Sequence, residues 1–296
     1  MLDAKIARGE LLARHTSFRI GGPAEYFVRV DTRAGLMEAV QWARARNLEI
    51  FILGNGSNIL VSDEGVRGLV IENHADEIAE RAARENLLVT ADSGASLPGL
   101  ANRLARQGWR GLEWAIGVPA TIGAAVVTNA GAHGGAVSDN LVRAEILDAQ
   151  NEVRWWTRDE LQYEYRASFL KRHPNQFVVL RAEFEFTRDE PADCIARMNQ
   201  YTEHRRKTQP TDSSIGSMFK NPQGDYAGRL IEQAGLKGTR VGNVQVSNVH
   251  ANFFVNLGGA TAGQVMQLVH LVQSAVREKF KVELELEIQL VGVWYV

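Results

Sequence analysis

The sequence predicts an α+β protein of two domains. Strand-like and helix-like segments follow one another irregularly along 296 residues, a length that can support two hydrophobic cores. A polar segment, Arg188-Asp189-Glu190-Pro191, interrupts this pattern about two thirds of the way along the chain. We therefore expect a larger domain over residues 1–189 and a smaller α+β domain over 190–296, with a last strand at 285–296 that completes the first domain.

The first domain begins with a β–α–β pattern. Residues 24–30 and 49–53 are apolar enough for strands, and Thr32 is expected to cap a helix through Asn47 with Leu36 and Val40 on one face. Ser96 is expected to cap a second helix, which ends at Gln107. Further strands are predicted at 58–61, 68–71, 87–91 and 177–186, and a hairpin at 141–149 and 152–156.

The second domain should begin with a helix at Pro191, because proline suits the first helical turn. That helix is expected to end in the basic run His204-Arg205-Arg206-Lys207. Helices are then predicted at 226–234 and 261–279, and strands at 241–246, 252–256 and 282–294.

Charge and cysteine content exclude several classes of function. The chain has 33 Lys and Arg against 35 Asp and Glu, so it lacks the excess of basic residues that is typical of nucleic-acid-binding proteins. Residues 1–10 lack the apolar core of a signal peptide, and we expect a cytoplasmic protein. Cys194 is the only cysteine, which excludes internal disulfides and cysteine-based metal clusters, and we predict no metal site.

An uncharged stretch is the most informative segment of the chain. Residues 114–138 contain no Asp, Glu, Lys or Arg, and most of them are small. Small residues let a large ligand approach the backbone, and free N–H groups can then meet an anion such as a pyrophosphate. Pro119, Asn129 and His133 argue against a transmembrane helix. A packed turn and a buried helix that need small residues only for close approach stay open as the alternative.

A second glycine cluster follows the predicted strand 49–53. Its backbone N–H groups can form a concave phosphate site, with Ser57 and Asn58 adding side-chain hydrogen bonds. No Gly-Lys-Ser/Thr follows and the third glycine of the dinucleotide fingerprint is missing, which disfavours both the P-loop and the NAD motif. A hairpin turn containing Asn-Gly is the alternative.

The two clusters together resemble a known type of flavoprotein. The patterns G-x-G-S-N-x-L and G-x-P-x-x-x-G are typical of FAD domains of the vanillyl-alcohol-oxidase (PCMH) type. Thr16 to Gly22 and the segment Ser214-Ile215-Gly216-Ser217-Met218-Phe219-Lys220-Asn221-Pro222 resemble the UDP-N-acetylenolpyruvoylglucosamine reductase (MurB) family. The resemblance covers nearly the whole chain and is closest to the shorter class, which lacks an extra tyrosine-bearing loop.

The resemblance implies noncovalently bound FAD and NADPH as the hydride donor. Ala120, Ala124 and Ala125 stand where the family often has glycine, and we expect helical or extended backbone there. The implied cofactor-binding residues are Gly54, Asn55, Gly56, Ser57, Asn58, Ile59, Leu60, Gly117, Val118, Pro119, Thr121, Ile122 and Gly123.

The resemblance also implies three catalytic residues. Hydride would pass from flavin N5 to C3 of the enolpyruvyl group, and Ser217 would donate a proton to C2. Arg166, in a Y-R-x-S-x-F match, and Glu287, which can carry a proton, would stabilise the negative charge on the substrate carboxylate. Without the family, Ser217 is an ordinary loop serine, Arg166 a surface arginine, and Glu287 the last of three alternating glutamates on a solvated strand face.

The implied substrate is UDP-N-acetylglucosamine enolpyruvate, reduced to UDP-N-acetylmuramate for peptidoglycan. Lys207 and Lys220 are candidates for its diphosphate, Asn221 for a further contact, and His250 and Asn252 for support of the site. The basic run before Pro210 can equally be a helix end whose cations complement the dipole. The alternatives are a flavin oxidase acting on an alcohol or hydroxy acid, and a nucleotide-binding module without turnover. A monomer is compatible with the sequence.

Overall fold

The computed structural model describes residues 2–294 and divides the chain into two compact units. The first unit comprises Met1–Ile6, Phe27–Gly54 and Gly68–Arg205, and the second comprises Ala7–Tyr26, Asn55–Arg67 and Arg206–Val296. Each unit is therefore built from segments that are far apart in sequence. The assignment of residues 1–189 to the cofactor and 190–296 to the substrate stays a prediction.

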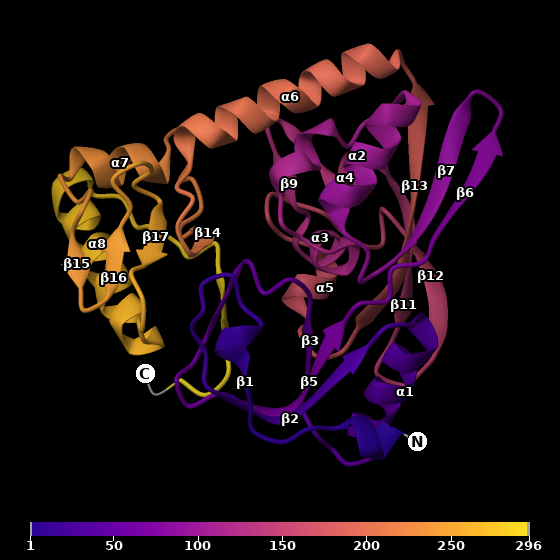
Figure 1. Cartoon of the computed structure of the whole chain (residues 1–296), viewed down its shortest axis with the longest axis horizontal. Coiled ribbons are helices and arrows are strands. Elements are labelled where there is room, and N and C mark those ends of the chain that lie inside the picture. Colours follow the sequence, from indigo (N-terminus) through magenta and orange to yellow (C-terminus); the bar gives the residue numbers. More distant parts are fainter. Residues whose placement is uncertain (1, 295–296) are drawn as a thin grey trace. The chain divides into compact units, whose positions relative to one another are not determined.

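The first unit contains a six-stranded antiparallel sheet. Its strand order is β12-β11-β13-β7-β6 (Figure 1). Strand β8 also pairs with β13. Phe184 and Phe186 of β13 are fully buried in the core of this unit, together with Val89 of β7. The strands are β6 (Ile78–Ala83), β7 (Asn86–Asp92), β8 (Trp109–Arg110), β11 (Leu141–Leu147), β12 (Val153–Thr157) and β13 (Val178–Arg188).

Local signals determine where the helices of the first unit begin. The Thr32 hydroxyl accepts a hydrogen bond from Gly35 N at 3.1 Å, and the Ser96 hydroxyl accepts one from Gly99 N at 3.2 Å. The elements outside the large sheet are η1 (Leu2–Lys5), α1 (Arg33–Arg44), α2 (Leu97–Gln107), η3 (Glu113–Gly117), α3 (Ile122–Thr128), β9 (Gly131–Ala132), β10 (Gly135–Ala136), α4 (Val137–Asn140), α5 (Phe169–Arg172) and α6 (Pro191–Thr208), of which α6 continues past Arg205 into the second unit.

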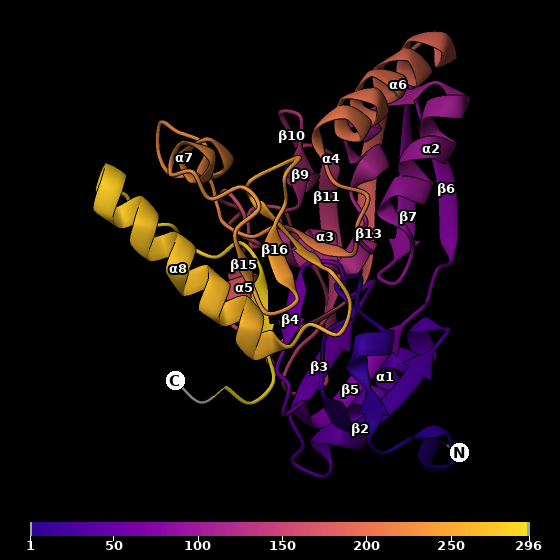
Figure 2. The same ribbon diagram turned by 60° about the vertical axis from the view of Figure 1, so that its left-hand side comes forward.

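The second unit contains a four-stranded antiparallel sheet in the order β14-β17-β16-β15. Helix α8 packs against β15 and β16 (Figure 2), and a capping box formed by Thr261 and Gln264 begins it. A parallel pair, β4 with β18, completes the unit. The elements are η2 (Leu12–Arg14), β4 (Ile59–Val61), β14 (Ser214–Ser217), α7 (Ala227–Gln233), β15 (Arg240–Val241), β16 (Val244–Val246), β17 (Phe253–Asn256), α8 (Ala262–Phe280) and β18 (Gln289–Val291).

A further four-stranded sheet has the order β1-β2-β5-β3. Its strand β3 pairs parallel with β5, as the predicted β–α–β unit requires. The strands are β1 (Glu10–Leu11), β2 (Pro23–Val30), β3 (Ile50–Leu53) and β5 (Val66–Asn73).

The α+β prediction is confirmed, and several element boundaries are corrected. The helix expected to reach Asn47 ends at Arg44, and the strand expected at 241–246 is a hairpin that turns at Gly242, whose φ is 55°. The strand expected at 282–294 is reduced to β18, because Glu285 O and Glu287 N bond to the loop after β14. Residues 295 and 296 of the predicted last strand lie outside the described part. Strand β6 was missed because Ile78 is its only large apolar residue and most of its side chains are exposed.

Candidate active site

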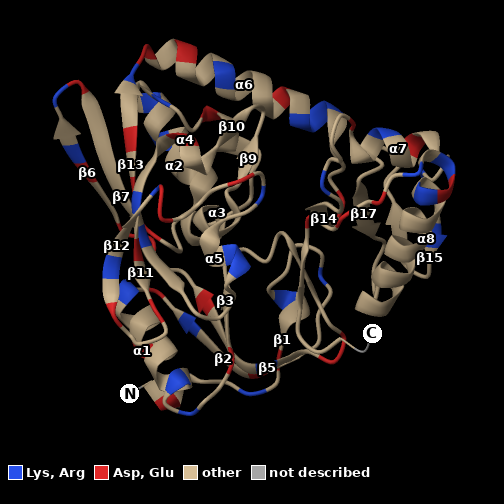
Figure 3. Ribbon diagram, turned by 180° about the vertical axis from the view of Figure 1, so that it is seen from behind, with Lys and Arg blue, Asp and Glu red and all other residues tan. Residues whose placement is uncertain are grey.

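The uncharged stretch and Gly54, which begins the second glycine cluster, meet inside the first unit. A Cβ atom added to Gly54 would lie 2.7 Å from Thr121 Oγ1, so only glycine permits this approach. The Thr121 hydroxyl accepts a hydrogen bond from Ala124 N at 3.5 Å and caps α3. Ala124 and Ala125 are helical, as expected for alanine at these positions. Figure 3 shows α3 without a charged residue.

Two glycines of the predicted cofactor wall, defined here as residues 114–138, pack closely against other parts of the chain. A Cβ atom on Gly123 would lie 2.8 Å from Ser93 Cβ, and one on Gly117 would collide with the Arg205 side chain. The close-packing interpretation therefore accounts for these two positions. Burial lowers the pKa of the Arg205 guanidinium, which lies directly against this wall.

The same wall also has surface left for a ligand. Gly117 and Val118 are half-buried, and Pro119 and Ala124 are exposed. None of residues 114–138 is acidic, so an anion at this surface meets no carboxylate from the stretch itself. These properties fit the phosphate-bearing cofactor that the sequence implies.

Arg166 lies on a tight hairpin of the first unit. Glu164 and Ala167 exchange backbone hydrogen bonds of 3.1 and 3.2 Å across the turn, and Arg166 has a positive φ of 56°. Its guanidinium lies 5.4 Å from the centre of the Tyr165 ring. Lys171 Nζ donates to the Arg166 carbonyl at 2.9 Å. The turn therefore holds the Arg166 backbone in a defined conformation.

Helix α3 anchors this hairpin. The Tyr163 hydroxyl donates to Val126 O at 3.0 Å, and the Ser168 hydroxyl donates to Val127 O at 2.6 Å. Burial raises the pKa of Tyr163, so its hydroxyl keeps the proton that it donates. The uncharged stretch thus positions Arg166, a role that its sequence did not indicate. Ser168, in the Y-R-x-S match, was the available signal, whereas Tyr163 lies outside that match.

Ser217 ends strand β14 in the second unit. Ser217 pairs with Phe253 of β17 after a register shift, and Gly216 has a positive φ of 81°. The next residue, Met218, accepts a hydrogen bond from Glu287 N through its carbonyl at 2.9 Å. The structure therefore brings the segments of Ser217 and Glu287 together, although 70 positions separate them.

Asn58 joins the same group. Its Nδ2 donates to Glu287 O at 3.4 Å, and its carbonyl accepts from Gln289 N at 3.0 Å. Glu287 is half-buried, whereas Glu283 and Glu285 are exposed, as expected for a solvated face. One end of the glycine cluster and two of the three predicted catalytic residues therefore lie together within the second unit. Arg166 belongs to the first.

Asn252 and His250 support the Ser217 segment. Asn252 is 3% exposed; its Oδ1 accepts from Phe219 N at 3.0 Å and its Nδ2 donates to Phe219 O at 2.8 Å. His250 Nδ1 accepts from Asn252 N at 3.2 Å. Burial, together with the charge of Lys237, lowers the pKa of His250, which favours the neutral ring that this contact needs.

The candidate diphosphate contacts differ in environment. Lys220 Nζ pairs with Glu285 Oε2 at 3.0 Å, and both side chains are partly or largely exposed. Asn221 Oδ1 accepts from Ala227 N at 3.1 Å. Lys207 is exposed in the last turn of α6. The substrate roles of all three residues stay predictions.

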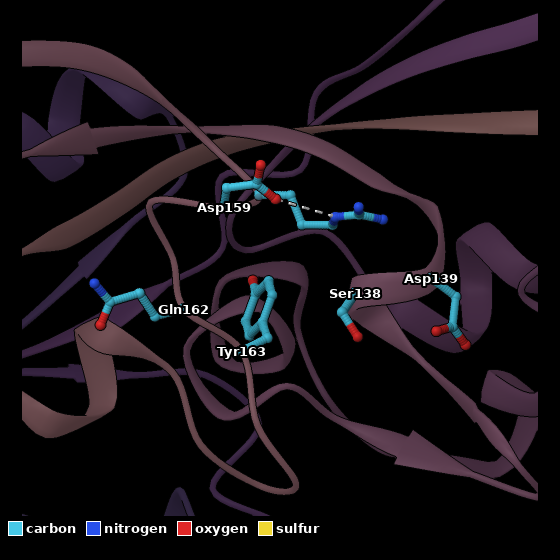
Figure 4. A pocket seen from close by; sticks show the side chains of 6 residues that line it. Ser138, Asp139, Asp159, Gln162 and Tyr163 are labelled. Carbon is cyan, nitrogen blue, oxygen red and sulfur yellow. Dashed lines mark ion pairs between the residues drawn. The ribbon is translucent and has the colours of Figure 1, made fainter.

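An open polar pocket of the first unit lies outside this group of residues (Figure 4). None of the predicted catalytic or binding residues lines it. Arg158 and Asp159 pair across it at 3.9 Å. Its lining residues are Ser138, Asp139, Arg158, Asp159, Gln162 and Tyr163.

Comparison with known proteins decides the family. The family model "UDP-N-acetylenolpyruvoylglucosamine reductase, C-terminal domain" matches residues 209–291, and "FAD binding domain" matches residues 24–157. A UDP-N-acetylenolpyruvoylglucosamine reductase from Chloroflexus aggregans is 42% identical over 98% of this chain and 99% of that protein. The chain belongs to the UDP-N-acetylenolpyruvoylglucosamine reductase family.

Other members of the reductase family agree with this assignment. A reductase from Symbiobacterium thermophilum is 45% identical over 97% of this chain and 92% of that protein. The crystal structure of the reductase from Thermus caldophilus superimposes with a TM-score of 0.81 at 36% identity, covering 97% of this chain and 99% of that one. The predicted family, fold and FAD cofactor are confirmed. Over residues 2–294 no helix is long and apolar enough to cross a membrane.

Proposed function

We propose that this chain uses NADPH to reduce UDP-N-acetylglucosamine enolpyruvate to UDP-N-acetylmuramate, in the cytoplasm, for peptidoglycan synthesis. The observation that carries the proposal is that the segments of Ser217 and Glu287 are hydrogen-bonded to each other and to Asn58. Ser217 and Glu287 both lie in the part of the chain that matches the reductase family model. Every residue assigned a role comes from one chain, so a monomer is compatible with this scheme.

Ser217 is the proposed proton donor to C2 of the enolpyruvyl group. When bound, FAD reduced by NADPH would provide the hydride that C3 of the enolpyruvyl group receives. An unactivated hydroxyl is a weak acid, but the carbanion-like C2 is strongly basic, and solvent then restores the serine proton. The hydride and the proton together saturate the C2–C3 double bond.

Arg166 and Glu287 are proposed to stabilise the charge that develops on the substrate carboxylate. A cation and a hydrogen-bond donor aimed at the substrate carboxylate both favour an enediolate more than the neutral alkene. The hairpin anchored to α3 holds the Arg166 backbone, and the Met218–Glu287 hydrogen bond holds Glu287 in register with the serine strand. Such fixed positions avoid reorganisation during the reaction.

Lys207, Lys220 and Asn221 are proposed to bind the diphosphate. Lys220 would exchange its pair with Glu285 for a phosphate oxygen. This exchange costs little, because exposed ion pairs contribute about 0–1 kcal/mol. Asn252 and His250 would position the serine segment without touching the substrate.

Stopped-flow absorbance of the purified flavoprotein tests the proposal. NADPH should bleach the flavin, and the UDP-sugar enolpyruvate should restore its colour. Ser217→Ala should keep the bleaching and slow the recovery by about 100-fold or more. Ser214→Ala, in the same strand, is the matched control. Equal loss of both half-reactions would remove the proton-donor role.

The same experiment separates the alternatives. Rapid reoxidation by oxygen without NADPH consumption would indicate an oxidase. A colourless protein would indicate a nucleotide-binding module.

A further inference from the structure

Tyr226 is an exposed aromatic residue for which the reaction scheme has no role. Its side chain is 68% exposed, the highest value among the large hydrophobic side chains that the structure describes over residues 2–294. It directly precedes α7 in the second unit. An aromatic ring so open to water contributes little to the core, and its flat face is accessible to a ligand.

The backbone around Tyr226 is held firmly. Asp225 N donates to Pro222 O at 3.2 Å, and Gly224 takes a positive φ of 79° in this turn. Tyr226 N donates to Asp225 Oδ1 at 2.6 Å. The following residue, Ala227, donates to Asn221 Oδ1 at 3.1 Å. The turn therefore returns the backbone to Asn221 at the residue that directly follows Tyr226.

The order of residues along this segment matches the order of groups along a sugar nucleotide. Ser217, at one end, is the proposed proton donor at the enolpyruvyl group. Lys220 and Asn221 follow in sequence as the proposed diphosphate contacts, and Tyr226 comes after them, one residue before the Ala227 N–H that binds Asn221. In the ligand, the group beyond the diphosphate is the uridine.

We propose that the Tyr226 ring stacks against the uracil base of the sugar nucleotide. This inference rests on the proposed function and adds the residue that recognises the base. A tyrosine ring offers a flat, amphipathic surface with few rotatable bonds. The carboxylate of the preceding residue, Asp225, accepts a hydrogen bond from Arg229 Nε at 2.6 Å. This pairing weakens its repulsion of a diphosphate bound nearby.

Binding of UDP and of inorganic pyrophosphate to the FAD-loaded enzyme tests this assignment. Tyr226→Ala should weaken UDP binding by roughly 5- to 100-fold, because base–aromatic stacking is lost. Tyr226→Phe should bind UDP within about twofold of the wild type, since the ring face remains. Pyrophosphate affinity should not change in either variant. The measurement is isothermal titration calorimetry.

Leu271→Ala, at another exposed apolar position of the same unit, is the matched control and should leave UDP binding unchanged. FAD content and the thermal midpoint show that each variant is folded. Unchanged UDP affinity in Tyr226→Ala, an equal loss of UDP and pyrophosphate affinity, or no rescue by phenylalanine would each overturn the stacking role. Failure of the wild type to reduce the enolpyruvate while it still binds UDP would overturn the proposed function instead.

Discussion

Replacing Asn252 with alanine should destabilise the second unit and displace the serine strand. Asn252 holds Phe219, two residues after Ser217, through both of its amide atoms. Asn252 and Phe219 are both buried, so water does not replace these bonds in the native state. The substitution removes one acceptor and one donor without providing another partner.

The magnitude follows from the two backbone groups left unpaired. Each buried polar group that loses its partner costs about 1–3 kcal/mol, so the two Phe219 groups together predict a loss of roughly 2–6 kcal/mol in unfolding free energy. The backbone bond from Met218 N to Asn252 O at 2.8 Å does not involve the side chain and can persist. The strand should therefore loosen around Ser217 rather than separate from β17.

Urea unfolding followed by circular dichroism measures the loss. Asn243→Ala, an exposed asparagine of the same unit, is the control and should change stability by less than about 0.5 kcal/mol. In the stopped-flow assay, Asn252→Ala should slow flavin reoxidation by the enolpyruvate more than flavin reduction by NADPH. A stability change below about 1 kcal/mol would refute the reasoning, because the two Phe219 groups would then have found other partners.

Two further predictions concern the first unit. Thr121→Ala should lower the stability of this unit by about 0.5–1 kcal/mol, because the α3 cap is lost. Thr121→Ser should retain most of that stability. Equal thermal midpoints for Thr121→Ala and the wild type would contradict the capping role. Glu145 is buried, which alone would raise its pKa, but hydrogen bonds from Arg181 at 2.9 Å and Arg33 at 2.6 Å outweigh burial and hold the pKa below its ordinary 4.5. The unfolded chain therefore takes up this proton at higher pH than the folded chain, so the carboxylate stabilises the fold above pH 4.5 and this contribution is lost as the pH falls below that value. Urea midpoints of Glu145→Gln should decline less steeply than those of the wild type in that acidic range, and parallel slopes would contradict the assignment.

Short-range signals were readable from the sequence. The starts of α1, α2 and α6 were predicted from Thr32, Ser96 and Pro191, because a cap or an N-terminal proline acts within one helical turn. The length of strand β18 was overestimated. The alternation at Glu283, Glu285 and Glu287 indicates that one face of the segment is exposed to solvent, but it does not indicate which segment the backbone pairs with. The backbones of Glu285 and Glu287 bond to the segment after β14 instead of continuing a sheet.

The sequence by itself determined the family, the cofactor and the candidate catalytic residues, because these depend on short motifs whose residue types and spacing survive without coordinates. Only the tertiary structure decided which of those residues act as neighbours and what holds them. Asn58 reaches the Glu287 carbonyl across 229 positions, and the uncharged stretch supports the Arg166 hairpin through Tyr163 and Ser168. Such contacts are made by distant segments whose meeting depends on the packing of the whole unit, and no local pattern of residues encodes that packing.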